Sequence, residues 1–497
     1  MGAFEKVRSG FPDMDGLLDH IRTGDNVVWR VGSIEEFRYF AKPFARQAVK
    51  EGRNLIYMRF ASYEPILEPE PGIKICEFDP DKGFEAFTVD IYNCITREGR
   101  EAFYVFDSLS SLQSVWYTDL MMGNFFRVTC PYLFKLDTVA YFPLLRGKHS
   151  FHTVSRIRDT TQLLLDVHSG EELYPHPLKV WNRYTPRMFL PHCMDPGSGK
   201  FRAVEDGVSM SRYYQLLEEE EIQEQDQSLD SYDRFSSMAR MEYRQGRFSE
   251  RTQQQIVEST MTKDPRLQEM IKEYFDPRDD FLLRDRMAGS GSIGGKACGM
   301  LLARKIVQTR LPWGRKYLEP HDSYYIGSDV FYTYIVSNNC WEIRIAQRTE
   351  EGYFAKAEDL RKALLSGEFP ADIREKFRSV LEYFGQSPII VRSSSFLEDG
   401  FGNAFAGKYE SVFCVNQGTP KERMREFEQA VRRVYASTMD PSALQYRRQR
   451  GLEGKDEQAE AGLVRDLPAS AGKSGIYQIY AGSTENIRGG IWESCRY

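Results

Sequence analysis

Short apolar runs separated by stretches of helical spacing recur between residues 26 and 167, and this alternation constrains the fold more than any other feature. The apolar runs are Asn26–Val31, Asn54–Phe60, Ala102–Phe106, Val139–Leu144 and Thr161–Val167. Helical spacing lies between them, most clearly at Glu35–Lys50 and Ala86–Thr96. Strands that alternate with helices predict βαβ units around a mostly parallel sheet, and hence an α/β fold.

Length and composition indicate a globular protein of several domains. The 497 residues predict about three domains, and the 41% hydrophobic and 28% charged residues lie in the globular range. The formal net charge is -6 and no basic cluster stands out, so we expect no nucleic-acid partner. The apolar stretches are well short of the roughly 18 residues that span a bilayer, so we expect no membrane association.

The N-terminus lacks the apolar segment of a secretory signal, so we expect a cytoplasmic protein. The eight cysteines are scattered without the spacing of a zinc site. We therefore predict free, mostly buried thiols and no metal ligands. The seven histidines are equally dispersed, and we expect them at surface or loop positions.

Three segments of the N-terminal region resemble the RecA/KaiC-like ATPases. Gly24–Val27 and Gly52–Tyr57 are similar to the segments on either side of that family's phosphate loop and its following helix. Phe103–Leu109 looks like the family's Walker B strand, with Asp107 at the acidic end. The resemblance implies a RecA-like domain over residues 1–193, through which the chain could oligomerise.

The phosphate loop of this domain is lost. Such a loop needs glycines whose amides converge on phosphate, a lysine for its charge and a hydroxyl for Mg²⁺. Val31–Phe37 has one glycine, no lysine and two carboxylates, Glu35 and Glu36. We therefore predict a degenerate domain that does not hydrolyse ATP. Asp107 is better explained as a cap of the turn after its strand than as a metal ligand.

Residues 194–280 differ in character from the region before them. They are polar, have helical propensity and include a run of four acids at Glu218–Glu221. Like-charge runs of this kind usually form solvated faces or linkers. We predict a helical, acidic connector and assign no chemistry to it.

A glycine-rich segment, Asp285–Met300, leads into a helical stretch. It is not a Walker A motif, because Ser290 and Ala297 stand where Gly and Ser/Thr belong, and no buried strand clearly precedes it as a dinucleotide-binding loop requires. A glycine turn before a helix with Lys296 in its first turn allows amides and a cation to approach an anion. From the local sequence alone, a plain loop before a helix is an equally good interpretation.

The second informative segment is Pro388–Asp399, an apolar strand that ends in Arg-Ser-Ser-Ser and leads into a glycine-containing loop. The strand delivers Arg392 and neighbouring hydroxyl groups at its carboxyl end. Arginine offers a permanently charged, bidentate fork, and the Gly402–Gly407 loop can fold over a ligand. The segment therefore suits phosphate recognition.

Together these segments resemble the ATP-grasp, AMP/ATP-binding domain of phosphoenolpyruvate synthase and pyruvate phosphate dikinase. Gly294–Met300 is similar to the family's GGKGxNL helix start. Val391–Asp399 with Ala404–Glu410 is similar to its VRSSAxxED and SFAGxxET strand and loop, and Val434–Ser437 with Ala443–Arg447 to its later helix. The motifs stand in the family's order. They imply the N-terminal part of an ATP-grasp (α+β) domain over residues 281–458.

The resemblance also implies a site and its ligands. Lys296 would contact the nucleotide phosphates, and Arg392 would hold the transferring phosphoryl group, since phosphoryl transfer needs charge neutralisation and alignment. The implied binding residues are Gly294, Gly295, Lys296, Arg392, Ser393, Ser394 and Gly407. The two serines are as well explained by a turn at the strand end. ATP and Mg²⁺ are the implied cofactors, pyruvate is the acceptor that the family suggests, and Gly402–Gly407 would be the lid.

The family pattern breaks off after residue 458. Residues 459–497 are rich in Gly and Ser and lack alternation, so we expect no central strand there and interpret the stretch as an atypical tail from a truncation or frameshift. The second ATP-grasp lobe and a phosphohistidine domain would then be missing. Two functions remain open: an incomplete ATP-dependent phosphotransferase, or a non-catalytic regulatory or scaffold protein with a nucleotide-binding remnant.

Overall fold

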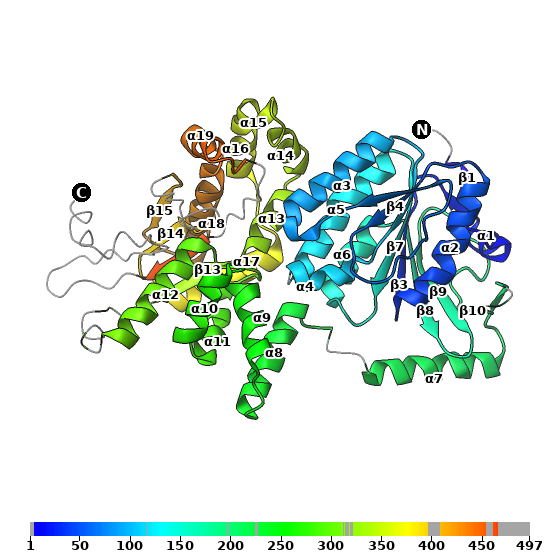
Figure 1. Ribbon diagram of the computed structural model, residues 1–497, viewed down its shortest axis with the longest axis horizontal. Helices are drawn as coiled ribbons and strands as arrows, with labels where there is room; N and C mark the ends of the chain where they lie inside the picture. Colours follow the sequence, from blue (N-terminus) through cyan, green and yellow to red (C-terminus); the bar gives the residue numbers. More distant parts are fainter. Residues whose placement is uncertain are drawn as a thin grey trace. The chain divides into compact units, whose positions relative to one another are not determined.

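The computed structural model describes residues 4–116, 118–195, 197, 199–223, 227–311, 313, 318, 322–395, 408–453 and 461–465. The chain divides into two compact units, unit 1 at Met1–Arg234 and unit 2 at Phe235–Tyr497 (Figure 1). Among the described helices, none has both the length and the apolar character that a membrane crossing requires.

Unit 1 is built on a nine-stranded sheet with the order β11-β10-β9-β8-β3-β7-β6-β4-β5. Its strands are β3 (Asn26–Val31), β4 (Leu55–Arg59), β5 (Ile73–Glu77), β6 (Phe103–Phe106), β7 (Val139–Leu145), β8 (Leu163–Ser169), β9 (Leu173–Val180), β10 (His192–Met194) and β11 (Phe201–Ala203). All pairs from β8 to β5 are parallel, and β9, β10 and β11 add antiparallel strands. The α/β fold predicted from the alternating pattern is confirmed.

Helices cover both faces of this sheet. They are α1 (Pro12–Leu18), α2 (Ile34–Lys50), α3 (Phe84–Glu98), α4 (Gln113–Trp116), α5 (Asp119–Lys135) and α6 (Phe151–Thr160), with short 3₁₀ turns η1 (Pro80–Lys82) and η2 (Leu109–Leu112) and a strand pair β1 (Lys6–Val7) and β2 (Ile21–Arg22). In Figure 1, α2 covers one face of the sheet, and α3, α5 and α6 cover the other.

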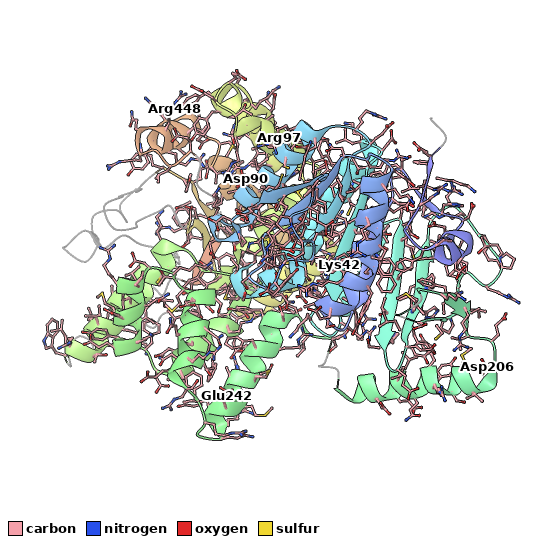
Figure 2. All side chains as sticks on the ribbon, turned by 45° about the vertical axis from the view of Figure 1, so that its right-hand side comes forward. Lys42, Asp90, Arg97, Asp206, Glu242 and Arg448 are labelled. Carbon is pink, nitrogen blue, oxygen red and sulfur yellow. The ribbon has the colours of Figure 1, made fainter. Side chains whose placement is uncertain are left out.

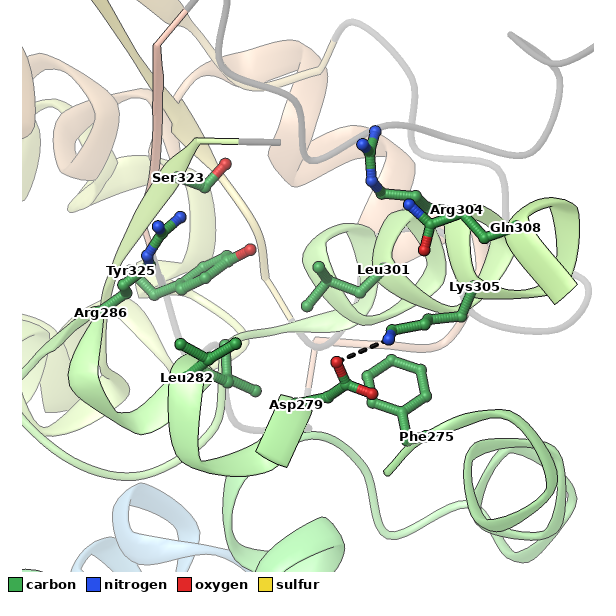
Figure 3. Close-up of a pocket in the computed structure, with 11 residues that line it drawn as sticks. Phe275, Asp279, Leu282, Arg286, Leu301, Arg304, Lys305, Gln308, Ser323 and Tyr325 are labelled. Carbon is green, nitrogen blue, oxygen red and sulfur yellow. Dashed lines mark ion pairs between the residues drawn. The ribbon is translucent and has the colours of Figure 1, made fainter. Parts of the chain in front are cut away.

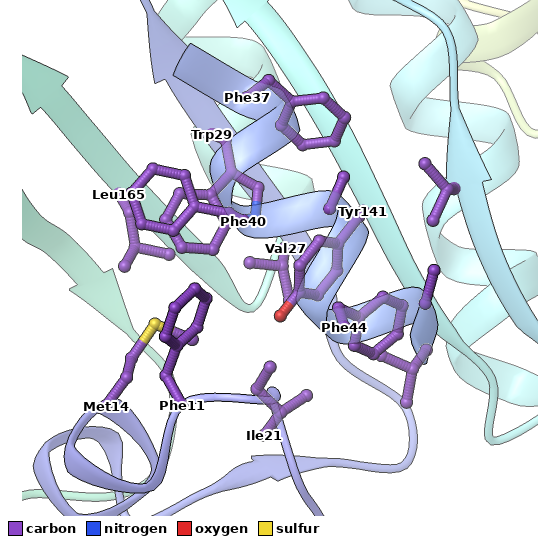
Figure 4. Close-up of a cluster of buried hydrophobic side chains, with 14 of the residues drawn as sticks. Phe11, Met14, Ile21, Val27, Trp29, Phe37, Phe40, Phe44, Tyr141 and Leu165 are labelled. Carbon is purple, nitrogen blue, oxygen red and sulfur yellow. The ribbon is translucent and has the colours of Figure 1, made fainter. Parts of the chain in front are cut away.

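The core between α2 and the sheet is aromatic (Figure 4). Phe37, Phe40 and Phe44 recur at helical spacing and are buried. Phe40 stacks on Trp29 of β3 with ring centroids 4.1 Å apart, and Phe44 stacks on Tyr141 of β7 at 4.0 Å. Because large aromatic side chains bury the most apolar area, this layer dominates the packing of the helix on the parallel strands.

The expectation of surface or loop histidines is wrong for His168 on β8 and His192 on β10, which are both buried. His149 lies in a loop, but its side chain is only 1% exposed. Its Nε2 lies 2.7 Å from Ser110 Oγ, and its Nδ1 lies 3.2 Å from Asp119 Oδ1. Ser110 Oγ also accepts the amide of Leu145 at 3.0 Å, and Asp119 accepts the amide of Ser150 at 2.8 Å. The side chains of Ser110, Asp119 and His149 are all buried. Their hydrogen bonds therefore hold η2 against the starts of α5 and α6.

The polar segment 194–280 is largely helical where it is described. It holds β11 and the helices α7 (Gly207–Gln223), α8 (Ser231–Arg244), α9 (Glu250–Thr260) and α10 (Pro265–Tyr274). Helix α8 begins in unit 1 and continues in unit 2. The domain limits proposed from the sequence remain predictions.

Unit 2 contains a five-stranded sheet with the order β12-β13-β16-β14-β15. The strands are β12 (Met287–Ala288), β13 (Ser323–Ile326), β14 (Ile389–Ser393), β15 (Ser411–Cys414) and β16 (Ala461–Arg465). The remaining helices are α11 (Pro277–Asp285), α12 (Gly295–Arg310), α13 (Ser328–Ser337), α14 (Trp341–Gln347), α15 (Gly352–Ala355), α16 (Ala357–Ser366), α17 (Ala371–Phe384), α18 (Pro420–Ser437) and α19 (Pro441–Gln449).

The expectation that no central strand follows residue 458 is wrong. Strand β16 lies in the middle of the sheet and pairs antiparallel with β13 on one side and β14 on the other. Without it, each of those two strands would present an unpaired row of backbone groups, which is costly away from water. Pairing on both edges therefore overrides a local pattern that is weak for a strand.

Candidate functional site

The glycine loop of unit 2 joins β12 to α12 and requires its glycines. Gly289, Gly291 and Gly294 have φ angles of 91°, 92° and 79°, in the region that other residues rarely adopt. A Cβ atom on Gly289 would lie 2.4 Å from Asp329 Oδ1, and one on Gly291 would lie 2.7 Å from Ser328 Oγ. The loop is thus pressed against the first turn of α13.

Asp329 braces this loop from inside the unit. Its carboxylate is fully buried and accepts the hydroxyl of Ser290 at 2.8 Å. Burial raises the pKa of Asp329 above its usual range. Arg284 holds the loop from the other side by donating to the carbonyl of Gly289 at 3.0 Å. The sequence analysis missed Asp329, because nothing in the sequence around it marks contact with a loop almost forty residues earlier.

Ser394 joins the two sequence motifs. Its hydroxyl accepts the amide of Ala297 at 3.0 Å and donates to the carbonyl of Ile293 at 2.8 Å. The amide of Gly295 donates to the carbonyl of Ser395 at 3.4 Å. Since the N-cap residue Gly294 has no side chain, Ser394, the residue directly after β14, supplies the cap of α12.

The junction gathers most of the predicted site residues. Lys296 is the second residue of α12 and is partly buried, and it immediately precedes the capped Ala297. Arg392 lies on β14, two residues before Ser394, and is paired in register with Ser411 and Gly462. The two predicted cations therefore originate from one corner of unit 2.

The serines of the strand end differ in their placement. Ser393 is 3% exposed and lies opposite Ala461 in the β14–β16 ladder. Ser394 is 0% exposed, and its hydroxyl has one donor and one acceptor within the protein. These contacts of Ser394 join it to the start of α12 and do not form the turn at the strand end that the sequence offered as one interpretation. Gly407 and the Gly402–Gly407 loop lie outside the described residues.

The third motif, Val434–Ser437 with Ala443–Arg447, makes contacts within unit 2. Arg447 of α19 is 4% exposed and donates to the carbonyl of Thr438 at 2.6 Å, just after α18 ends. Ser437 of α18 accepts the amide of Glu410 at 3.0 Å, which fixes the residues that lead into β15. These contacts position the sheet edge beside Arg392.

One family model matches a segment of unit 2. Residues 290–477 match the pyruvate phosphate dikinase AMP/ATP-binding domain. The match begins in the glycine loop, includes Lys296, Arg392 and both serines, and extends through β16. The comparison with curated proteins gave no match.

We call the matched residues 290–477 the dikinase-type domain, after the model that they match. The extent of the match bears on two predictions. The family pattern was expected to end at residue 458, whereas the match continues for 19 residues more, to 477. This extension includes β16, which pairs with a strand on each side and therefore forms without the alternating pattern that identifies a strand locally. The match does not reach residues 1–193, so their RecA-like character stays a prediction.

A separate cavity of about 290 Å³ lies along α12 in unit 2 (Figure 3). Its lining is Phe275, Asp279, Leu282, Leu283, Arg286, Leu301, Arg304, Lys305, Gln308, Ser323 and Tyr325. Lys305 is held by Asp279 at 2.6 Å and lies over the ring of Phe275. Because neither Lys296 nor Arg392 lines it, this cavity is distinct from the predicted phosphate site.

In unit 1, the residues that were compared with a RecA-like phosphate loop and Walker B strand contact other protein groups. The amide of Gly32 donates to Glu36 Oε2 at 2.8 Å. Asp107 is 0% exposed and accepts hydrogen bonds from Tyr57, Arg59 and the amides of residues 60 and 61, at 2.5 to 2.8 Å. Asp107 was expected to cap the turn after its own strand, whereas the amides that it accepts follow β4, the neighbouring strand.

Proposed function

We propose that the dikinase-type domain binds ATP at the junction of α12 and β14 and belongs to a phosphotransferase of the phosphoenolpyruvate synthase and pyruvate phosphate dikinase type. The observation that carries the proposal is the family match over residues 290–477, which includes the hydrogen-bonded junction. Lys296 and Arg392 originate at this junction from two different elements. A lysine and an arginine on two elements that meet at one junction suit recognition of a chain of phosphates.

Side chains, more than backbone amides, supply the positive charge in this proposal. The amides of Gly295 and Ala297 already donate within the protein, so the start of α12 offers fewer donors than an uncapped helix. Lys296 would then contact the phosphates as a mobile point charge, and Arg392 would orient the transferring group through its planar fork. Mg²⁺ and a pyruvate-like acceptor belong to the proposal through the resemblance alone.

Calorimetry with ATP and Mg²⁺ on the full chain tests the site. We expect Lys296→Ala and Arg392→Ala each to weaken binding by about tenfold or more, since each removes a charged contact of about 1.5–3 kcal/mol. Lys362→Ala and Arg378→Ala are matched controls on exposed faces of α16 and α17, and should leave the affinity unchanged. Binding that is equal in all four variants would contradict the site.

The second candidate is a non-catalytic regulatory or scaffold protein, and unit 1 favours it. There, Glu36 and Asp107 are engaged by the protein's own groups where a RecA-like ATPase would bind nucleotide and metal. We infer a RecA-like unit that has lost its ligand and retains an assembly role, supported by its parallel sheet and by Asp107 at the end of β6.

Turnover separates the two candidates. A phosphotransferase should release AMP or phosphate from ATP when pyruvate is supplied, and Lys296→Ala should lower that rate. A scaffold should bind ATP without any release above the rate of the Arg392→Ala variant. Size-exclusion chromatography with light scattering then checks whether the chain assembles.

A further inference from the structure

Two cysteines of unit 1, one on a strand and one on a helix, are in contact at the edge of its sheet. Cys76 lies on β5, the last strand of the nine-stranded sheet, and Cys94 lies on α3. Their Sγ atoms are 3.5 Å apart, with the thiol of Cys94 donating to the sulfur of Cys76. The two sulfur atoms are thus in contact although neither cysteine belongs to a CxxC motif.

The two thiols differ in access to solvent. Cys94 is 3% exposed, whereas Cys76 is partly exposed on the edge strand. Burial, together with the neighbouring Cys76 thiol, raises the pKa of Cys94 to about 12. Cys94 is therefore the protonated, enclosed partner, and Cys76 is the one that a reagent can reach.

A single cation serves both sulfur atoms. Arg97, which is labelled in Figure 2, lies one turn after Cys94 on α3. Its Nη2 is 3.4 Å from Cys94 Sγ and 3.9 Å from Cys76 Sγ. Its charge opposes the rise in the pKa of Cys94, and the thiolate is the nucleophilic form of cysteine. The other described cysteines are all buried: Cys130, Cys193, Cys298, Cys340 and Cys414.

We propose that Cys76 and Cys94 form a reversible dithiol–disulfide site that is oxidised by a low-molecular-weight disulfide such as oxidised glutathione. The Cys76 thiolate attacks one sulfur of the reagent, the reagent's S–S bond breaks, and one reagent thiol leaves with the proton that Cys76 gave up. Cys94 then loses its proton and attacks Cys76 Sγ in the mixed disulfide, which expels the second reagent thiol. The protein dithiol loses two electrons and two protons, and the reagent gains both.

The structure accommodates the new bond with a small movement. The sulfur atoms must approach from 3.5 Å to about 2.0 Å. Strand β5 is paired on one side only, with β4, so it can shift toward α3 without breaking a second ladder. The bond would tie the exposed edge of the sheet to the helix that covers it, and thereby restrain the unfolded chain.

Peptide mapping of the full chain tests the proposal. Reduced protein is incubated with excess oxidised glutathione, alkylated and digested without reductant. We expect a peptide pair linked through Cys76 and Cys94, two hydrogen masses lighter than the separate peptides and released by dithiothreitol. Tm of the first unfolding transition should rise by about 5 °C on oxidation.

Three variants assign the order of attack. Cys94→Ser should retain glutathione on Cys76, because the resolving thiol is gone, whereas Cys76→Ser should take up none at Cys94. Cys340→Ser, which removes a buried thiol of unit 2, should form the 76–94 link like the unmodified chain. The proposal is overturned if folded protein, judged by circular dichroism, keeps both thiols alkylatable under excess oxidant, or if Cys76 stops at the glutathione adduct in the unmodified chain.

Discussion

Asp280 and Asp329 are carboxyl groups that unit 2 keeps away from water. Asp280 is 1% exposed, and neither of its oxygens has a hydrogen-bond partner in the described part of the chain. Burial, and then the charges of Asp279 and Asp276, raise the pKa of Asp280 to about 8. A buried carboxyl group in this state is neutral near pH 7, so folding is linked to its protonation.

We expect the stability of unit 2 to decline with rising pH because of Asp280. The folded state raises the pKa of this acid from 3.8, its value in the unfolded chain, to about 8. Its contribution to the free energy of unfolding is therefore fully present below pH 3.8 and is lost as the pH rises through about 8. Asp280→Asn should remove this loss and stabilise the protein at pH 8.5 by up to about 6 kcal/mol, with little change at pH 4. Urea unfolding at both pH values measures the difference.

An exposed carboxyl group supplies the control for that measurement. Asp359 of α16 is 56% exposed at its side chain and pairs with Lys356. Asp359→Asn should leave the pH dependence of unfolding unchanged. If the free energy of unfolding of both variants changes with pH as steeply as that of the unmodified chain, Asp280 is not the group whose protonation is linked to folding.

The glycine loop gives a second prediction at the residue scale. Gly289→Ala combines a left-handed backbone with a Cβ 2.4 Å from Asp329, so it should destabilise unit 2 by at least about 2 kcal/mol. Gly299→Ala, inside α12 with no atom within 4 Å of the new Cβ, should instead stabilise by about 0.5–1 kcal/mol. Denaturant midpoints of the two variants should therefore move in opposite directions, and a common direction would count against the tight loop.

At the scale of elements, the start of α12 depends on another element for its cap. Ser394→Ala leaves the amide of Ala297 and the carbonyl of Ile293 without their partner and should cost about 1–3 kcal/mol. Hydrogen exchange at Ala297 should accelerate, and ATP affinity should fall with it if the proposed function holds. Ser366→Ala, at an exposed helix end, is the control. Unchanged exchange at Ala297 would refute the capping role.

Strand β16 illustrates a limit of local patterns at the same scale. The apolar runs that became β3, β6 and β7 are buried between helices and were identified as strands from their composition. Residues 461–465 have no such run, and their strand is defined by hydrogen bonds to β13 and β14. A strand that pairs along both of its edges can form from residues with a weak intrinsic preference for β structure, and such residues do not identify it in the sequence.

For the molecule as a whole, we expect nucleotide binding to be confined to unit 2. Asp107→Asn removes the charge that faces Arg59 and should destabilise unit 1 by about 2–4 kcal/mol, because it leaves a largely buried guanidinium uncompensated. The affinity for ATP should stay the same. Asp90→Asn, at an exposed position of α3, controls for loss of charge. Loss of ATP affinity in folded Asp107→Asn would place a nucleotide in unit 1 instead.

The sequence located the cations of the candidate site but not the contacts that place them. Lys296 and Arg392 were named from their motifs, and the structure brings their backbones to one corner. Asp329, the cap from Ser394 and the enclosed His149 were missed, since each depends on a partner that is distant in the sequence. No local period or spacing encodes such a pairing.

What the sequence by itself determined is therefore the nature of several elements: alternating apolar runs specify β3, β4, β6, β7 and β8 of unit 1, and a cluster of glycines specifies the loop before α12. These are local properties, fixed by side-chain periodicity and backbone sterics. Only the tertiary structure decided the central place of β16, the junction at Ser394 and the contact between Cys76 and Cys94. Each joins segments that chain topology brings together, and the free energy of such contacts exists only once both sides are in place.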